Sequence, residues 1–159
     1  MTTVSTYQKY LVADMLTKRL ERIGLAVMHI IFATDFDKRG TTGAQVDVSI
    51  DYRDAAGKWM SDEAREAKVN EWLTLYPDTT VERAAEYGGK PDMLARGATS
   101  VGIAWEVNFR SGVCERVQVG TRTEESYAPE QIANLEKVTI EVPVYEYVCP
   151  DPILAAVSA

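Results

Sequence analysis

Apolar side chains recur every three to four residues near the start of the chain and every second residue in much of the remainder. Between residues 7 and 23 an apolar stripe runs from Val12 at helical spacing, with charged residues on the opposite side. This pattern predicts an amphipathic helix. Ser5 is placed to cap its first turn, and Gly24 stands where helices commonly end in the left-handed conformation.

Two strands are predicted next. Residues 25–33 are apolar almost without a break, which predicts a strand near the sheet centre with both faces covered. Residues 45–52 instead alternate apolar and polar side chains, the pattern of a half-buried strand. The segment 54–57 then predicts a turn.

Helical signals occupy the middle of the chain. Ser61 is placed to cap a helix that Pro77 ends. Residues 79–82 have the T-x-x-E spacing of a capping box, which predicts a short helix ending at Gly88 and Gly89. One further helical turn is expected within residues 91–97.

Strand patterns return in the second half. Residues 101–109 and 113–119 alternate around the R-S-G of residues 110–112, which predicts a hairpin with a three-residue loop. This register places Trp105 opposite Val117 and keeps most apolar pairs together.

The last predicted strand covers residues 137–149 and changes phase after Pro143. Since proline in a strand is confined mostly to edges and bulges, we expect an edge strand with a bulge at Pro143 and Val144. The whole pattern predicts one α+β domain over residues 1–159. It has a mainly antiparallel sheet of about five strands, helices on one face, and an extended tail at 150–159.

The bulk composition agrees with one folded domain. The chain has 159 residues, 46% hydrophobic residues and a net charge of −7, enough to build a single core. The negative balance argues against nucleic-acid binding, which needs clustered Lys and Arg. It favours a protein partner with a basic surface.

The sequence also indicates where in the cell the protein is expected. No apolar run approaches the ~20 residues of a membrane span, and the N-terminus lacks a signal-peptide pattern, so we expect a cytoplasmic protein without a membrane partner. Cys114 and Cys149 are the only cysteines, and we expect both to be free thiols in a reducing cytoplasm.

The stretch D-F-D-K-R-G-T-T-G, residues 35–43, is the sharpest candidate for chemistry. Asp35 and Asp37 follow a predicted strand, as in the nucleophile loop of haloacid-dehalogenase-type phosphatases, but Arg39 departs from that pattern and a strand follows where a helix is needed. We interpret the stretch as a long hairpin loop. The alternative is an Mg²⁺ site of Asp35, Asp37 and Asp47 in a phosphohydrolase or nuclease.

Other catalytic patterns are missing. His29 is the only histidine and lies in the most apolar segment, where we expect a buried, hydrogen-bonded side chain. Nucleotide-binding glycine motifs are absent. The sequence therefore predicts no catalytic residue and no cofactor.

Partner binding is the remaining interpretation. Asp47 and Asp51 lie on the polar face of their strand, and Tyr145 and Tyr147 lie on the predicted edge strand. An acidic face and a tyrosine-bearing edge suit contact with another protein. The same edge strand could join copies of this chain into a homo-oligomer.

The segments C-E-R-V-Q-V-G-T-R-T-E and V-T-I-E-V-P-V-Y-E-Y-V-C-P-D-P-I-L, between Cys114 and Leu154, resemble the tails of small uncharacterised proteins of actinobacterial tailed phages. The resemblance implies a phage accessory protein made in the cytoplasm of a bacterial host. The function expected is non-enzymatic protein–protein interaction, as a host-factor inhibitor or an assembly factor. A virion structural component is the further alternative.

Overall fold

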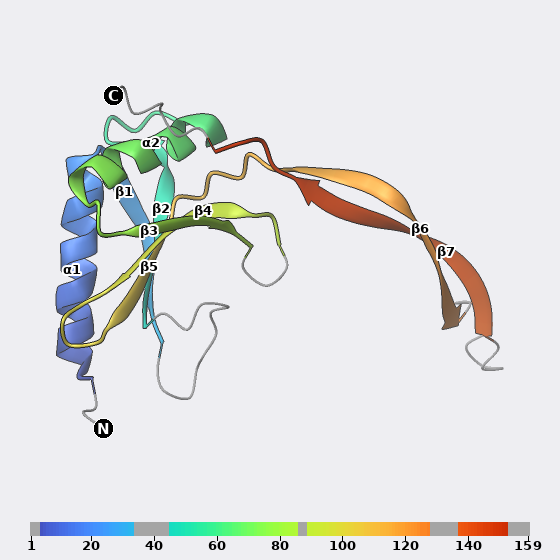
Figure 1. Cartoon of the computed structure of the whole chain (residues 1–159), viewed down its shortest axis with the longest axis horizontal. Helices are drawn as coiled ribbons and strands as arrows, with labels where there is room; N and C mark the ends of the chain where they lie inside the picture. The colour runs from blue at the N-terminus through green and yellow to red at the C-terminus, as the bar shows by residue number, and fades with distance from the viewer. Residues whose placement is uncertain (1–3, 34–44, 86–88, 128–136, 153–159) are drawn as a thin grey trace. The chain divides into compact units, whose positions relative to one another are not determined.

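The computed structural model describes residues 4–33, 45–85, 89–127 and 137–152. The chain separates into two compact units (Figure 1). The first unit comprises Met1–Val113 and Pro150–Ala159, and the second comprises Cys114–Cys149.

The described part of the first unit contains two helices and five strands, and the strands form one sheet in the order β1-β2-β5-β4-β3. Neighbouring strands are antiparallel, except that β2 and β5 run parallel. The elements are α1 (Thr6–Arg22), β1 (Leu25–Phe32), β2 (Val46–Asp54), α2 (Asp62–Leu75), β3 (Thr80–Ala84), β4 (Asp92–Ala98) and β5 (Ala104–Asn108).

Both predicted helix starts are confirmed. The Ser5 side chain accepts a hydrogen bond from the backbone N–H of Gln8, whose side chain bonds back to Ser5 and completes a capping box. Gly24 follows α1 with a φ of 77°, the left-handed conformation that glycine adopts without a steric penalty. Ser61 caps α2 by accepting from the N–H of Ala64.

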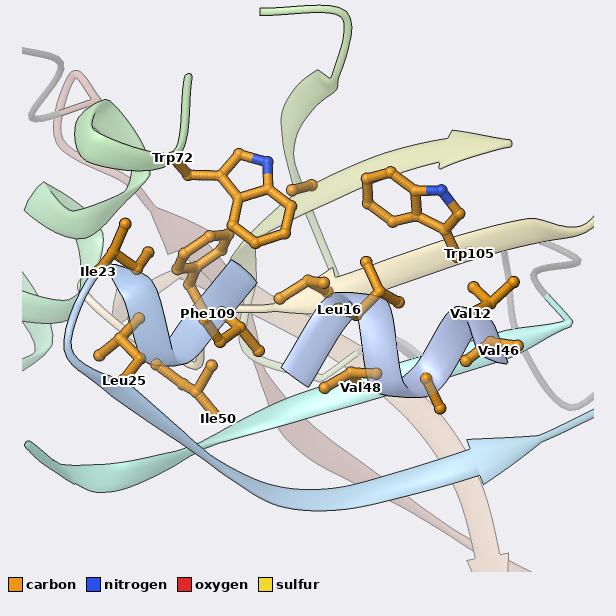
Figure 2. Close-up of a cluster of buried hydrophobic side chains, with 14 of the residues drawn as sticks. Val12, Leu16, Ile23, Leu25, Val46, Val48, Ile50, Trp72, Trp105 and Phe109 are labelled. Carbon is orange, nitrogen blue, oxygen red and sulfur yellow. The ribbon is translucent and has the colours of Figure 1, made fainter. Parts of the chain in front are cut away.

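The core lies between the two helices and one face of the sheet (Figure 2). The predicted alternation in β2 is confirmed, because Val46, Val48 and Ile50 are buried while the residues between them are partly exposed. Trp72 of α2 meets Trp105 of β5 at a centroid distance of 6.1 Å. The predicted fold class is therefore confirmed: α+β, mostly antiparallel, with the helices on one face.

The position of β1 differs from the prediction, since this strand lies at one edge of the sheet. Met28 and Ile31 are about half exposed, and His29 is exposed and not part of the core. The strand is apolar on both faces, but only one face packs against the core. On that face Phe32 meets Tyr10 of α1 edge to face, with ring centroids 4.9 Å apart.

The helices predicted after α2 are wrong. Residues 80–84 form β3 and residues 92–98 form β4, which pair antiparallel. The T-x-x-E spacing favours a helix locally, but the side chains make contacts that a strand requires. Glu82 forms a cross-strand ion pair with Arg96, and Val81 packs against the core. Tertiary pairing overrides the local helix signal here.

The predicted hairpin around residues 110–112 is also wrong. Trp105 lies beside Val46 of β2 and Gly97 of β4, not opposite Val117. The corner after β5 is tied to the start of β4, since Ser111 Oγ accepts from the N–H of Met93 at 3.2 Å. Three apolar cross-strand pairs had suggested a local partner, but both neighbours of β5 come from earlier in the chain.

The second unit is a long two-stranded hairpin of β6 (Glu115–Tyr127) and β7 (Lys137–Val148). Among the described residues each of these strands pairs only with the other, so the predicted edge character of β7 is confirmed. An irregularity lies between Gln118 and Gly120, which pair with Tyr145 and Val144. The extra residue is therefore Val119 of β6, opposite the position predicted for the bulge.

A disulfide joins Cys114 to Cys149 at the base of the hairpin, so the expectation of free thiols is wrong. The two cysteines are 35 residues apart in sequence. The pairing of β6 with β7 brings their Cα atoms to 4.2 Å, which the sequence spacing alone could not indicate.

Candidate protein-binding surfaces

The sheet face opposite the helices carries the acidic residues predicted from β2. Asp47 is the register partner of Glu106 in the parallel β2–β5 pair, so both side chains lie on this face. Arg96 of β4 donates to Glu106 at 2.7 Å and also forms an ion pair with Glu82 of β3. The face therefore combines carboxylates with a central arginine and is not purely acidic.

Asp51 lies at the other end of β2 and is partly neutralised. The Arg53 guanidinium bonds the Asp51 carboxylate at 3.1 Å. Hydrogen bonds from the Arg53 side chain and backbone hold the pKa of Asp51 below its usual range. Because Arg53 partly neutralises the charge of Asp51, this carboxylate should contribute less to the binding of a basic partner.

The three aspartates of the predicted Mg²⁺ site are not brought together by any described contact. Asp35 and Asp37 lie outside the described residues. Among the described residues, the carboxylate beside Asp47 is that of Glu106 on the neighbouring strand. Among the residues that the structure describes, no group of three or more His, Cys, Asp or Glu side chains could hold a metal ion.

One face of the hairpin carries a row of aliphatic side chains, called the valine face below. Antiparallel register partners share a face, so alternate residues of β7 line it together with Val117 of β6. Its β7 members are Val138, Ile140, Val142, Val144 and Val148. Val148 is 56% exposed and Ile140 and Val117 are each 40% exposed.

The opposite face carries the predicted tyrosines, called the tyrosine face below. Tyr145 and Tyr147 lie on it with their register partners Gln118 and Arg116. Both tyrosines are exposed, and the Arg116 guanidinium lies 4.0 Å from the centroid of the Tyr145 ring. Exposed Tyr and Arg are the residue types that dominate the energetics of protein interfaces.

The hairpin has an acidic balance. Between Cys114 and Cys149 the sequence has seven glutamates against two arginines and one lysine, a net charge of −4. A two-stranded sheet has no interior of its own, and an isolated hairpin is marginally stable in water. The hairpin thus presents aliphatic side chains, tyrosines and negative charge on surfaces that a partner can cover.

Sequence reasoning missed a cation–aromatic cluster beside α2. The guanidinium carbons of Arg65 and Arg110 lie 4.7 and 4.6 Å from the centroid of Tyr52. Arg65 is almost fully buried and donates to the backbone carbonyls of Arg110 at 2.9 Å and Met60 at 2.6 Å. The contacts join residues far apart in sequence, so no local pattern signals them.

Glu66 of α2 is a buried carboxylate, and it was not expected from the sequence. Its side chain is fully buried and pairs with Arg83 of β3. Burial raises the pKa of Glu66 above the ordinary glutamate range, although the neighbouring Arg83 opposes this shift. The pair links α2 to the edge strand of the sheet.

Comparison with known proteins adds no relationship: no family model matches the chain, and neither curated proteins nor solved structures give a match. In the part of the chain that is described, no helix is both long and apolar enough to cross a membrane. The chain's own surfaces are therefore the basis on which a function can be inferred.

Proposed function

We propose that this chain is a non-enzymatic accessory protein that acts by binding another protein through its disulfide-closed hairpin. The observation that carries the proposal is the hairpin itself, with 13 and 12 residues in its two strands and exposed apolar side chains on both faces. Pairing of the two strands does not by itself require so many exposed apolar side chains.

The hairpin favours a particular kind of partner. Because anchors occur on both faces, a groove that closes over the valine face and the tyrosine face fits better than a flat surface. The net charge of −4 calls for a basic rim around that groove. The phage context implied by the C-terminal resemblance is part of the proposal, with the partner a host factor to be inhibited or a phage protein to be assembled.

A comparative pulldown tests the proposal. Tagged full-length chain is used as bait in lysate of the natural host, beside a Tyr145→Ala/Tyr147→Ala variant and an Ile140→Lys/Val142→Lys variant. We expect one partner with wild-type bait and its loss with each hairpin variant. Trp59→Ala, which alters a 79% exposed side chain of the first unit, is the matched control and retains the partner.

Two outcomes would contradict the proposal. One is the absence of any partner that the hairpin variants lose, and the other is equal recovery by all baits. Light scattering of the purified chain addresses the two remaining expectations. A homo-oligomer paired through β7 gives a small defined oligomer, and a virion structural component gives rings or larger shells.

A further inference from the structure

A cavity of about 400 Å³ opens in the first unit. It lies between α1, the segment that follows α2, and the end of β4. Its apolar wall is formed by Met15, Leu75, Tyr76, Pro77 and Trp105. The volume falls within the range of ~300–1,000 Å³ typical of small-ligand sites.

Arg19 supplies a fixed positive charge on the cavity wall. Its guanidinium carbon lies 4.3 Å from the centroid of Tyr76 and 6.0 Å from that of Trp105. Trp72 supports both rings from the core, with centroid distances of 4.9 and 6.1 Å. The aromatic contacts therefore position the cation before any ligand arrives.

The donor groups of Arg19 have no hydrogen-bond or ion-pair partner among the residues that the structure describes. Stacking uses the flat faces of a guanidinium, whereas its N–H groups point outward along its edge. That edge matches a carboxylate, which it can bind through two parallel hydrogen bonds.

The remaining lining restricts the ligand further. Thr79 and Thr99 add hydroxyl groups to the wall, whereas Met15, Leu75 and Trp105 give it an apolar side, so the part of the ligand that packs on that side should be apolar. Asp78 also lines the cavity, and because its negative charge repels every anionic group there, a ligand with two anionic groups is disfavoured more strongly than one with a single carboxylate. We propose that the cavity binds a monocarboxylate with an apolar body, held by Arg19 against Tyr76 and Trp105.

Such a carboxylate has two sources, a free small acid or the C-terminal residue of a peptide. The site is independent of the hairpin, so its failure would leave the proposed function untouched. Gly97 helps to shape it, because a Cβ there would approach Cζ2 of Trp105 to 2.4 Å. The glycine allows the indole to lie directly against β4.

The test is an NMR titration of the full-length chain, followed by the indole N–H of Trp105 and the side-chain Nε–H of Arg19. The probes are benzoate with its neutral analogue benzamide, and a tripeptide ending in phenylalanine with its C-terminal amide. We expect saturable shifts with benzoate or the free-acid tripeptide and none with either neutral analogue. Binding of benzoate alone identifies a small-acid site, and binding of the tripeptide identifies a peptide C-terminus.

Variants assign the binding to Arg19. Arg19→Gln should weaken carboxylate binding by about tenfold or more, and Arg19→Lys, which keeps the charge but loses the fork, by a smaller factor. Arg22→Gln, in the last turn of the same helix, is the control and should bind as wild type. The proposal is overturned if neither carboxylate binds, if inorganic phosphate binds equally well, or if both Arg19 variants bind as wild type.

Discussion

Gly97 faces Trp105 across the β4–β5 pair, and the indole occupies the space that a side chain at position 97 would need. In Gly97→Ala the new methyl group would lie 2.4 Å from Cζ2 of Trp105, so the ring must move from its packed position beside Trp72. We expect a loss of about 1–3 kcal/mol in the free energy of unfolding. Urea denaturation followed by tryptophan fluorescence measures it.

Gly120→Ala is the control for that experiment. Gly120 also lies in a strand, but a Cβ at this position meets no heavy atom within 4 Å. All three tryptophans belong to the first unit, so the same signal should be unchanged. Equal midpoints for Gly97→Ala and wild type would show that the indole is not confined as described.

Glu66 makes the stability of the first unit depend on pH. Since burial raises the pKa of Glu66 in the folded state, the folded protein holds this proton more tightly than the unfolded chain. The resulting stabilisation is fully present below the unfolded pKa near 4.5 and is lost as pH rises through the folded value. Wild-type stability minus that of Glu66→Gln should therefore fall with rising pH.

Denaturation of both proteins between pH 4 and pH 8 measures this difference, with Glu71→Gln as control. Glu71 is on the same helix, but its carboxylate is exposed and pairs with Lys68 at 2.9 Å. A difference between wild type and Glu66→Gln that rises with pH would contradict the raised pKa.

At the scale of the element, the disulfide is the main constraint on the hairpin. Closing a loop of 35 residues stabilises a fold by about 3–4 kcal/mol, whereas a two-stranded hairpin alone is marginal. In the Cys114→Ser/Cys149→Ser variant we expect the hairpin to open while the first unit stays folded.

Amide hydrogen exchange distinguishes the two units. Protection of β6 and β7 should fall strongly in the variant, whereas protection of β2 and β5 and the tryptophan fluorescence should not change. Unchanged exchange in β6 and β7 would mean that strand pairing alone holds the hairpin. Reduction of the wild-type chain should reproduce the effect of the double substitution.

Elements with local signals could be predicted from the sequence. The caps at Ser5 and Ser61 and the alternation of β2 depend on residues within a few positions of one another, and all three are confirmed. β3 could not be predicted, because its strand character comes from pairing with β4 and from Glu82 meeting Arg96. The strand character of β5 was predicted, but its pairing was not, because β2 is distant in sequence and a helical turn was expected where β4 lies.

The features of the candidate surfaces also divide into those with a local sequence signal and those that depend on distant residues. Pro143 indicated that β7 is an edge strand, whereas the exposure of Tyr145 and Tyr147 depends on their place in a two-stranded hairpin, which was not predicted. The stacking of Arg19 on Tyr76, and the disulfide that closes the hairpin, join residues separated by dozens of positions. No spacing rule within one sequence reaches that far.

For the whole molecule, charge sets how a complex should respond to salt. The chain carries a net charge of −7, of which −4 belongs to the hairpin. Charges at an exposed interface are screened within about 8 Å at physiological ionic strength. We therefore expect the dissociation constant of the partner complex to rise with added salt, mainly through slower association.

Surface plasmon resonance at several salt concentrations measures this dependence once the partner is in hand. Glu141→Gln/Glu146→Gln removes two hairpin charges, one on each face, and should flatten the salt dependence without unfolding the hairpin. An affinity independent of salt would place the binding surface away from the acidic hairpin.

The disulfide also brings together the points where the chain leaves and rejoins the first unit. The Cα atoms of Cys114 and Cys149 are 4.2 Å apart, close to the ~3.8 Å between consecutive residues of any chain. In genetic terms the hairpin has the topology of a 36-residue insertion, which a single short linker could replace. A gene of this kind can exchange its hairpin for another while the remainder of the protein keeps its sequence.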